Sequence, residues 1–247
     1  MATLGDVLYS GMSRAPAPEQ EWVGLVWAIA AGDQVTLHGL YERTHRLVYT
    51  SIVHIVASPE IAEKLTLEVF HDLWRRAYRY DPRHGPVLAW LMNQARSRVL
   101  AWLLYPRKKH DDAAEFGDES RASLQERLAH RIAMDTGEPP VLPGKHDWSE
   151  PQWEDVAPGI SCQVLAFDGD RHVVSMLVRL APGGEYPPHT HAGVEELHLL
   201  DGELWIDERK LYPGDYNRAD PGTADRRVWS ETGCTCVLVT STQDVLA

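Results

Sequence analysis

The sequence is poor in cysteine and in long apolar runs. Its 247 residues contain three cysteines, and none precedes Cys162. Three cysteines do not form a disulfide framework, so we expect a chain that works in a reducing cytoplasm. No stretch of about 18 apolar residues exists, which leaves no membrane-spanning helix to predict. Residues 1–17 also lack a basic segment followed by an apolar one, so no secretory signal is expected.

Acidic and basic residues are distributed unevenly along the chain. The net charge is −12, but residues 1–110 hold 13 Lys and Arg against 10 Asp and Glu. The remaining residues, 111–247, hold 11 Lys and Arg against 26 Asp and Glu. Halves of opposite sign suggest separate domains with different partners. The strongly acidic second half is a poor candidate for nucleic-acid binding.

The first half has a helical pattern. Apolar residues recur at helical spacing over residues 21–31 and 35–57. Ser58, Pro59 and Glu60 predict the start of a third helix, because they supply a capping hydroxyl, a proline in the first turn and an acid near the positive helix end. Asp81 with Pro82 ends that helix, and a fourth is expected from residue 86 to about 105.

A polar stretch and then a β pattern follow. Residues 107–147 are expected to form a linker with one amphipathic helix near residues 120–134. Short β segments are predicted at residues 162–167, 173–180, 196–200, 204–206 and 236–240, separated by Gly- and Pro-containing turns. The fold class is therefore a two-domain α+β protein, with an N-terminal all-α bundle (20–106), a linker (107–147) and a C-terminal all-β barrel (148–247).

A candidate metal site lies in the β half. The spacing G-x5-H-x-H-x3-E-x6-G places His189 and His191 two residues apart, where a strand directs both to one face. Glu195 can return on the next strand as a third ligand. Two imidazoles and a carboxylate suit Zn²⁺, or Fe or Mn. Surface histidines on a β-hairpin are the alternative interpretation.

The expected strand near the C-terminus also carries Cys234 and Cys236 on one face. Such a pair of thiols could sense oxidants, although the alternative is that both are inert, buried strand positions. His198 follows Glu195 by three residues, so strand parity turns it to the opposite face and predicts a packing role.

The second half resembles the cupin domain of ChrR-type anti-sigma factors. The motif above is the first cupin metal motif, and W-x2-V-A-P-G-I at 153–160, L-V-R-L-A-P-G at 177–183, Y-P-G-D-Y at 212–216 and W-S-x2-G-C at 229–234 also fit. In that family a second motif, G-x5-P-x-G-x2-H, supplies a fourth ligand. Here Asp225 stands at the histidine position, so the resemblance implies that Asp225 completes or borders the metal site.

Residues 34–109 resemble conserved region 2 of extracytoplasmic-function (ECF) sigma factors. The resemblance runs through L-Y-E-R-T-H-R-L-V-Y at 40–49, S-P-E-I-A-E at 58–63, E-V-F-x2-L-W-R-R at 68–76 and A-W-L-x3-A-R-x-R at 89–98. It implies that Glu68, Asp72 and Trp74 face RNA polymerase core. It also implies that basic residues of the following segment meet promoter DNA, namely Arg96, Arg98, Arg107, Lys108 and Lys109.

Three functions are compatible with these features. The first is a transcription regulator in which a metal-bound cupin sensor controls a sigma-like domain in a stress response, with RNA polymerase, promoter DNA or a sigma or anti-sigma protein as partner. The second is a decoy or anti-sigma protein that mimics region 2, which Lys64 and Ala101 favour because the family usually has aspartate near both positions. The third is a metal-dependent cupin enzyme, dioxygenase- or isomerase-like. A homodimer through the cupin is also compatible, and no membrane is expected as a partner.

Overall fold

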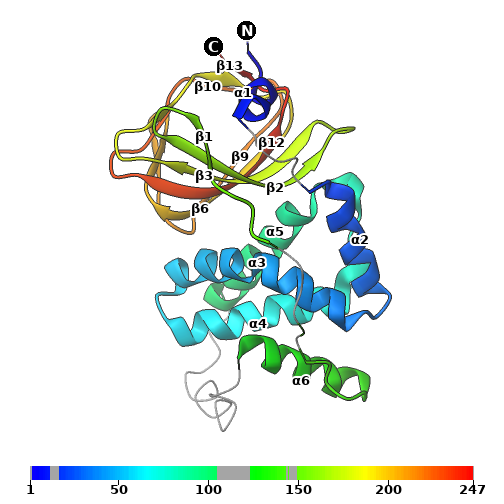
Figure 1. Cartoon of the computed structure of the whole chain (residues 1–247). Coiled ribbons are helices and arrows are strands. Elements are labelled where there is room, and N and C mark those ends of the chain that lie inside the picture. The colour runs from blue at the N-terminus through cyan, green and yellow to red at the C-terminus, as the bar shows by residue number, and fades with distance from the viewer. Residues whose placement is uncertain (1, 12–16, 105–122, 143, 145–148, 247) are drawn as a thin grey trace. The chain divides into compact units, whose positions relative to one another are not determined.

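The computed structural model describes residues 2–11, 17–104, 123–142, 144 and 149–246. The chain divides into two compact units (Figure 1). The helical unit comprises Gly24–Asp81 and Trp90–Ser149, and the β unit comprises Met1–Val23, Pro82–Ala89 and Glu150–Ala247. The predicted fold class, a helical N-terminal region and a β-rich C-terminal region, is confirmed. The proposed boundaries 20–106, 107–147 and 148–247 stay a prediction, because much of the expected linker lies outside the described residues.

The helices begin close to where their capping residues predict. The side chain of Asp33 accepts hydrogen bonds from the second and third backbone N–H groups that follow it, and Ser58 caps the next helix with Pro59 in its first turn. The helices and 3₁₀ segments are α1 (Leu4–Gly11), α2 (Glu19–Ala30), α3 (Gln34–Val56), α4 (Pro59–Arg76), η1 (Ala77–Arg79), η2 (Pro82–His84), α5 (Val87–Leu104) and α6 (Leu124–Thr136).

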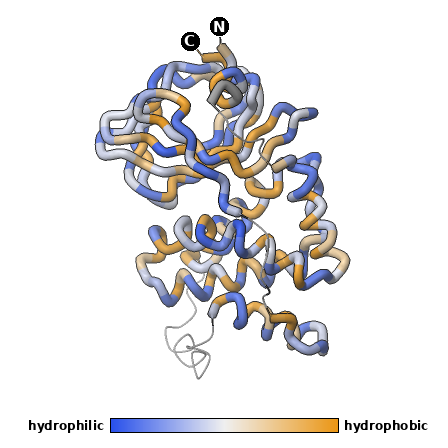
Figure 2. Tube along the Cα trace, in the orientation of Figure 1, coloured by the Kyte–Doolittle hydropathy of each residue, from blue (hydrophilic) through white to orange (hydrophobic). Residues whose placement is uncertain are grey.

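Helix α6 corresponds to the helix predicted near residues 120–134. Ser123 and Glu126 form a capping box at its start, so the helix is specified locally. Its apolar side does not face solvent, because Leu128, Ala129 and Ile132 are fully buried where α6 packs on α4 and α3. Figure 2 shows apolar and hydrophilic residues alternating along the helices, as expected of helices with one buried side. Helix α6 is therefore part of the helical unit.

The β unit is built from many short strands. They form three sheets with the orders β1-β2-β3-β12-β6-β9, β10-β5-β13 and β4-β11-β7-β8. The strands are β1 (Glu154–Ala157), β2 (Ile160–Asp168), β3 (Val173–Leu180), β4 (Glu185–Tyr186), β5 (His189–Thr190), β6 (Glu195–Gly202), β7 (Leu204–Ile206), β8 (Arg209–Leu211), β9 (Tyr216–Ala219), β10 (Ala224–Asp225), β11 (Val228–Trp229), β12 (Cys234–Ser241) and β13 (Val245–Leu246).

Five of the strands were predicted, whereas β1, β8, β9 and the two-residue strands were not among the predicted segments. Strands β2, β3, β6, β7 and β12 cover the five predicted segments. Gly202, which closes the histidine motif, has φ +77, and a Cβ there would lie 2.0 Å from the carbonyl oxygen of Gly233. Only glycine fits this close approach of two strands, which explains why the motif ends in that residue.

Helix α1 was not expected from the sequence. Its side chains Leu4 and Leu8 are buried in the apolar core of the β unit, with residues of strands β2, β3, β6 and β12. Sequence reasoning missed it because eight residues are too short for a strong helical period. Among the described residues, no helix combines the length and the apolar composition needed to cross a membrane.

Candidate metal centre

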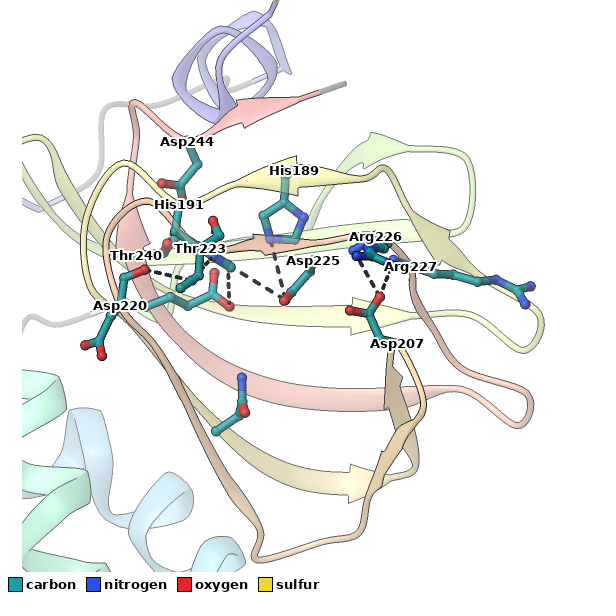
Figure 3. Close-up of polar contacts among 12 residues, drawn as sticks. His189, His191, Asp207, Asp220, Thr223, Asp225, Arg226, Arg227, Thr240 and Asp244 are labelled. Atoms are coloured by element: carbon teal, nitrogen blue, oxygen red, sulfur yellow. Dashed lines mark hydrogen bonds and ion pairs between the residues drawn. The ribbon is translucent and has the colours of Figure 1, made fainter.

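Four side chains from three short stretches of the β unit converge on one point. His189 lies on β5, His191 directly follows that strand and Asp225 lies on β10 (Figure 3). Glu195 begins β6. Strands β5 and β10 are antiparallel, and Asp225 stands directly opposite His189. One ligand atom from each of the four residues lies within 4.8 Å of the others. The structure therefore brings together all four residues that the sequence nominated.

The distances suit an ion at the centre of the cluster. Nε2 of His191 lies 3.7 Å from Oε1 of Glu195 and 3.7 Å from Oδ2 of Asp225, and Nε2 of His189 lies 4.0 Å from the same Asp225 oxygen. These separations are too long for hydrogen bonds. They match the spacing of ligand atoms that each lie about 2.0–2.2 Å from a shared metal ion.

The hydrogen bonds around the cluster orient the imidazoles for coordination. Nδ1 of His189 lies 3.1 Å from the carbonyl oxygen of Pro187, and Nδ1 of His191 lies 3.1 Å from the carbonyl oxygen of Thr223. A ring that donates from Nδ1 keeps a lone pair on Nε2, which points into the cluster. Nε2 of His191 and Oδ2 of Asp225 are both buried and make no hydrogen bond. Such orphaned atoms are costly, and a bound cation would satisfy both.

Burial and neighbouring charge change the protonation of these groups. The Glu195 carboxylate raises the pKa of the His191 imidazole to about 9. Burial raises the pKa of Asp225, opposed by the nearby imidazoles of His191 and His189. Because a metal ligand must be deprotonated, ion binding has to displace the proton that His191 otherwise holds.

Asp244 borders the cluster and was missed by sequence reasoning. Its carboxylate accepts hydrogen bonds from the backbone N–H of Ala192, at 2.7 Å, and from the hydroxyl of Thr240, at 2.6 Å. Burial raises its pKa. No spacing motif includes this residue, which reaches the site because β13 pairs with β5.

The three thiols are buried and free. Burial raises the pKa of Cys162 to about 12 and that of Cys234 to about 11, and it raises the pKa of Cys236 well above the usual value. Cys234 and Cys236, the pair considered as an oxidant sensor, both lie on β12 and are both buried. These features favour the buried-strand interpretation over oxidant sensing.

In the helical unit, residues assigned to different partners contact each other. Arg98 on α5 forms ion pairs with Asp72 and with Glu68 on α4, the latter at 3.5 Å. Trp74 is half-buried and lies on another side of α4, because a residue two positions after Asp72 is rotated by about 200° around a helix. Arg96 is exposed. Arg107, Lys108 and Lys109 lie outside the described residues.

The two units correspond to two known domain families. A helical unit followed by a β unit with a buried His₂-Glu-Asp cluster defines a two-domain protein with a candidate metal centre. Residues 40–107 match the Sigma-70 region 2 family, and residues 146–244 match the ChrR cupin-like domain family. The chain therefore combines a Sigma-70 region 2 domain with a ChrR cupin-like domain.

Two of the curated relatives are sigma factors. The ECF RNA polymerase sigma factor SigK of Mycolicibacterium vanbaalenii is 31% identical over 129 residues, covering 52% of this chain and 66% of the relative. The protein of the same name from Mycobacterium tuberculosis strain CDC 1551 is 27% identical over 89 residues, covering 36% of this chain and 48% of the relative. The chain thus spans about two thirds of one relative and about half of the other.

Two solved structures show partial similarity. One is Rhodobacter sphaeroides SigE in complex with the anti-sigma ChrR, at 18% identity and a TM-score of 0.35, covering 62% of this chain and 81% of that one. The other is an acetylacetone dioxygenase from Acinetobacter johnsonii, at 15% identity and a TM-score of 0.35, covering 41% of this chain and 79% of that one. Both TM-scores lie below 0.5, too low to extend either function to this chain.

Proposed function

We propose that the chain regulates transcription, with a metal-binding cupin domain that controls a sigma-like domain able to engage RNA polymerase core, promoter DNA or both. The observation that carries this proposal is the presence of a Sigma-70 region 2 domain and a ChrR cupin-like domain in one chain. Relatives described as ECF RNA polymerase sigma factors support polymerase as a partner. The protein would then act in the cytoplasm, in a stress response, as a sigma or anti-sigma type regulator.

The proposed metal ligands are His189, His191, Glu195 and Asp225. Two imidazoles and two carboxylates suit Zn²⁺ best, with Fe and Mn as alternatives. A divalent ion would place positive charge between two buried carboxylates and satisfy the orphaned atoms of His191 and Asp225. Metal occupancy can control the helical domain only if the ion binds two conformations of the protein with different affinity.

The proposed polymerase surface is the part of α4 that carries Glu68, Asp72 and Trp74. Asp72 and Glu68 both form ion pairs with Arg98. Carboxylates at this position suit a basic partner surface. The proposed DNA contacts begin with exposed Arg96 and extend to Arg98, Arg107, Lys108 and Lys109. Because Arg98 is held by two carboxylates, a phosphate contact from it would require those pairs to break.

Capture of core polymerase by the full-length chain tests the proposal. Metal-loaded and chelator-treated protein should retain different amounts of polymerase or of −10-type promoter DNA. The binding constant for the DNA should fall as the salt concentration rises. A sigma or anti-sigma protein captured in a metal-dependent way would also support it. If neither metal form captures any of these partners, the regulator proposal is wrong.

A metal-dependent enzyme is a second candidate. The observation in its favour is a cavity inside the barrel that reaches His189, Glu195 and Asp225. An ion with an open coordination position beside such a cavity could activate an oxygen donor. Turnover of a small molecule that depends on His189 and His191, without polymerase capture, would favour this function.

A further inference from the structure

The β unit contains a partly open cavity, and the N-terminal helix α1 forms part of its wall. The cavity has a volume of about 160 Å³. Leu4 and Val7 of α1 line it together with aliphatic side chains of the barrel strands, while His189, Glu195 and Asp225 line its polar end. Figure 1 shows α1 at the same end of the β unit as β10 and β13. An N-terminal segment thus forms part of the wall of the cavity that reaches the candidate metal centre.

Helix α1 is attached by a small number of specific contacts. The backbone N–H of Leu4 donates to the carbonyl of Asp244 at 2.9 Å, and that of Gly5 donates to the carbonyl of Thr242 at 2.8 Å. In the opposite direction, the N–H of Leu246 donates to the carbonyl of Ala2 at 3.0 Å. Leu4 and Leu8 provide the apolar anchor. An eight-residue helix is too short to be stable alone, so α1 keeps its structure by docking.

The size and lining of the cavity define what it can hold. An apolar cavity of about 150 Å³ accepts a molecule of the size of benzene, which has about six heavy atoms. Two of the lining residues are Cys162 and Cys236, which contribute neutral thiols and add no charge. The body of a ligand therefore has to be apolar and compact.

The polar end of the cavity defines the rest of the ligand. Glu195, Asp225 and Asp244 bring three carboxyl groups to this end. Three carboxylates carry more negative charge than one divalent ion neutralises, so a further anion is disfavoured there even when the ion is bound. A neutral hydroxyl or carbonyl oxygen meets no such repulsion and can approach an ion held by the cluster. The complementary ligand is uncharged, with one oxygen donor.

We propose that the cavity is a binding site for a small, uncharged, apolar molecule with one hydroxyl or carbonyl oxygen, and that helix α1 is its lid. The molecule enters when α1 undocks and is enclosed when α1 returns. The contact of the ligand's oxygen with an ion rests on the metal centre of the proposed function, whereas the apolar part of the ligand and the lid do not. Ligand occupancy therefore stabilises the docked state of α1.

Binding of cyclohexanone to the full-length protein tests the site. The probe has about seven heavy atoms, an apolar ring and one carbonyl. Saturable NMR shifts are expected for cavity methyl groups such as those of Val178 and Leu197, with protection of the α1 amides from hydrogen exchange. Chelation of the metal should weaken binding about tenfold. Hexanoate, of similar size but charged, should bind at least about tenfold more weakly than cyclohexanone.

Two variants separate the lid from the cavity. Leu8→Asp removes a buried anchor of α1 that does not line the cavity, so it should weaken cyclohexanone binding and abolish the protection of the α1 amides. The control, Ala2→Asp, introduces the same charge at an exposed position and should leave binding and protection unchanged. Cys162→Leu should fill the cavity and block the probe. Equal binding by wild type and Leu8→Asp would disprove the lid, and tight binding of hexanoate would disprove the ligand class.

Absence of any saturable shift, in both metal-loaded and chelated protein, would disprove the site itself. This result is distinguishable from failure of the proposed function, because polymerase capture is measured separately and requires no probe. If the protein binds no metal, the chelated arm still tests the apolar body and the lid.

Discussion

A charged cluster of the helical unit and the candidate metal cluster of the β unit differ in how their charged groups are satisfied. In the helical unit charged side chains pair with one another, as Arg98 does with Asp72 and Glu68. In the β unit His191 and Asp225 lie close together, yet each leaves a buried ligand atom without a hydrogen bond. The first arrangement stabilises a helix bundle at neutral pH without any additional component. The second is costly unless an ion occupies it.

The largest expected effect concerns the packing of α6 on the helical unit. Ile132 is 0% exposed, so Ile132→Asp places an unpaired carboxylate in the core and should cost about 4 kcal/mol of unfolding free energy. Met134 is 85% exposed, so Met134→Asp on the same helix should change stability by less than about 0.5 kcal/mol. Chemical denaturation monitored by helical circular dichroism measures both. Equal effects would mean that α6 is not docked in solution.

Removal of the two imidazoles tests whether the β unit depends on an ion. His189→Ala with His191→Ala deletes two of the four candidate ligands, and the affinity for zinc should fall more than about 100-fold. The control is His198→Ala, because that histidine is buried against Tyr216, outside the cluster. Metal analysis of purified protein and competition with a chelator give the affinities. If purified wild-type protein contains no metal, the cluster of the β unit does not depend on an ion, and in this respect it does not differ from the ion pairs of the helical unit.

The pH dependence of metal binding follows from the charge at His191. Glu195 raises the pKa of this imidazole to about 9, so below pH 9 the metal-free site holds a proton that the ion must displace. Lowering the pH therefore opposes binding, and the apparent zinc affinity should rise about tenfold per pH unit between pH 6 and 8. Calorimetry in buffers of different ionisation enthalpy measures the released proton. A flat profile would show that His191 binds no proton in the metal-free site.

Substitution of Asp225 measures how much the fourth ligand contributes. Asp225→Asn keeps the shape but loses the charge, and zinc affinity should fall about tenfold. Asp225→His introduces the residue usual at this position in ChrR-type cupins, and its affinity should equal or exceed that of the wild type. A crystal structure of the zinc form checks the geometry, since a carboxylate oxygen more than about 4 Å from the ion would place Asp225 outside the coordination sphere.

The smallest expected effect concerns the ion pairs of Arg98. This side chain is 30% exposed, so its pairing with Asp72 should contribute about 0.5 kcal/mol to stability. Asp72→Arg should therefore change the free energy of unfolding little, but it should weaken polymerase capture. Combining it with Arg98→Asp restores the pair with its charges exchanged. If the double variant regains capture, the pair serves to position α4 and α5; if capture stays weak, Asp72 itself contacts the partner.

Local sequence predicted the longer helices, five of the strands and the His189, His191 and Glu195 ligands. Capping residues such as Asp33, Ser58 and Ser123 predict where helices begin, because they bond to backbone groups a few residues away. The histidine spacing predicts a shared strand face for the same reason. Short-range geometry is enough in each case.

Only the tertiary structure decided what lies around these features. Sequence could not place Asp244 beside the histidine motif, because its hydrogen bond to Ala192 joins residues 52 positions apart. Nor could it place α1 against the barrel cavity, because those contacts join the two ends of the chain. Nor could it show that Arg98 meets Asp72, since the helices that carry them are separated by a turn whose path no local pattern specifies. Contacts between distant residues depend on how whole elements pack, and packing is determined by the summed burial of many side chains rather than by any one motif.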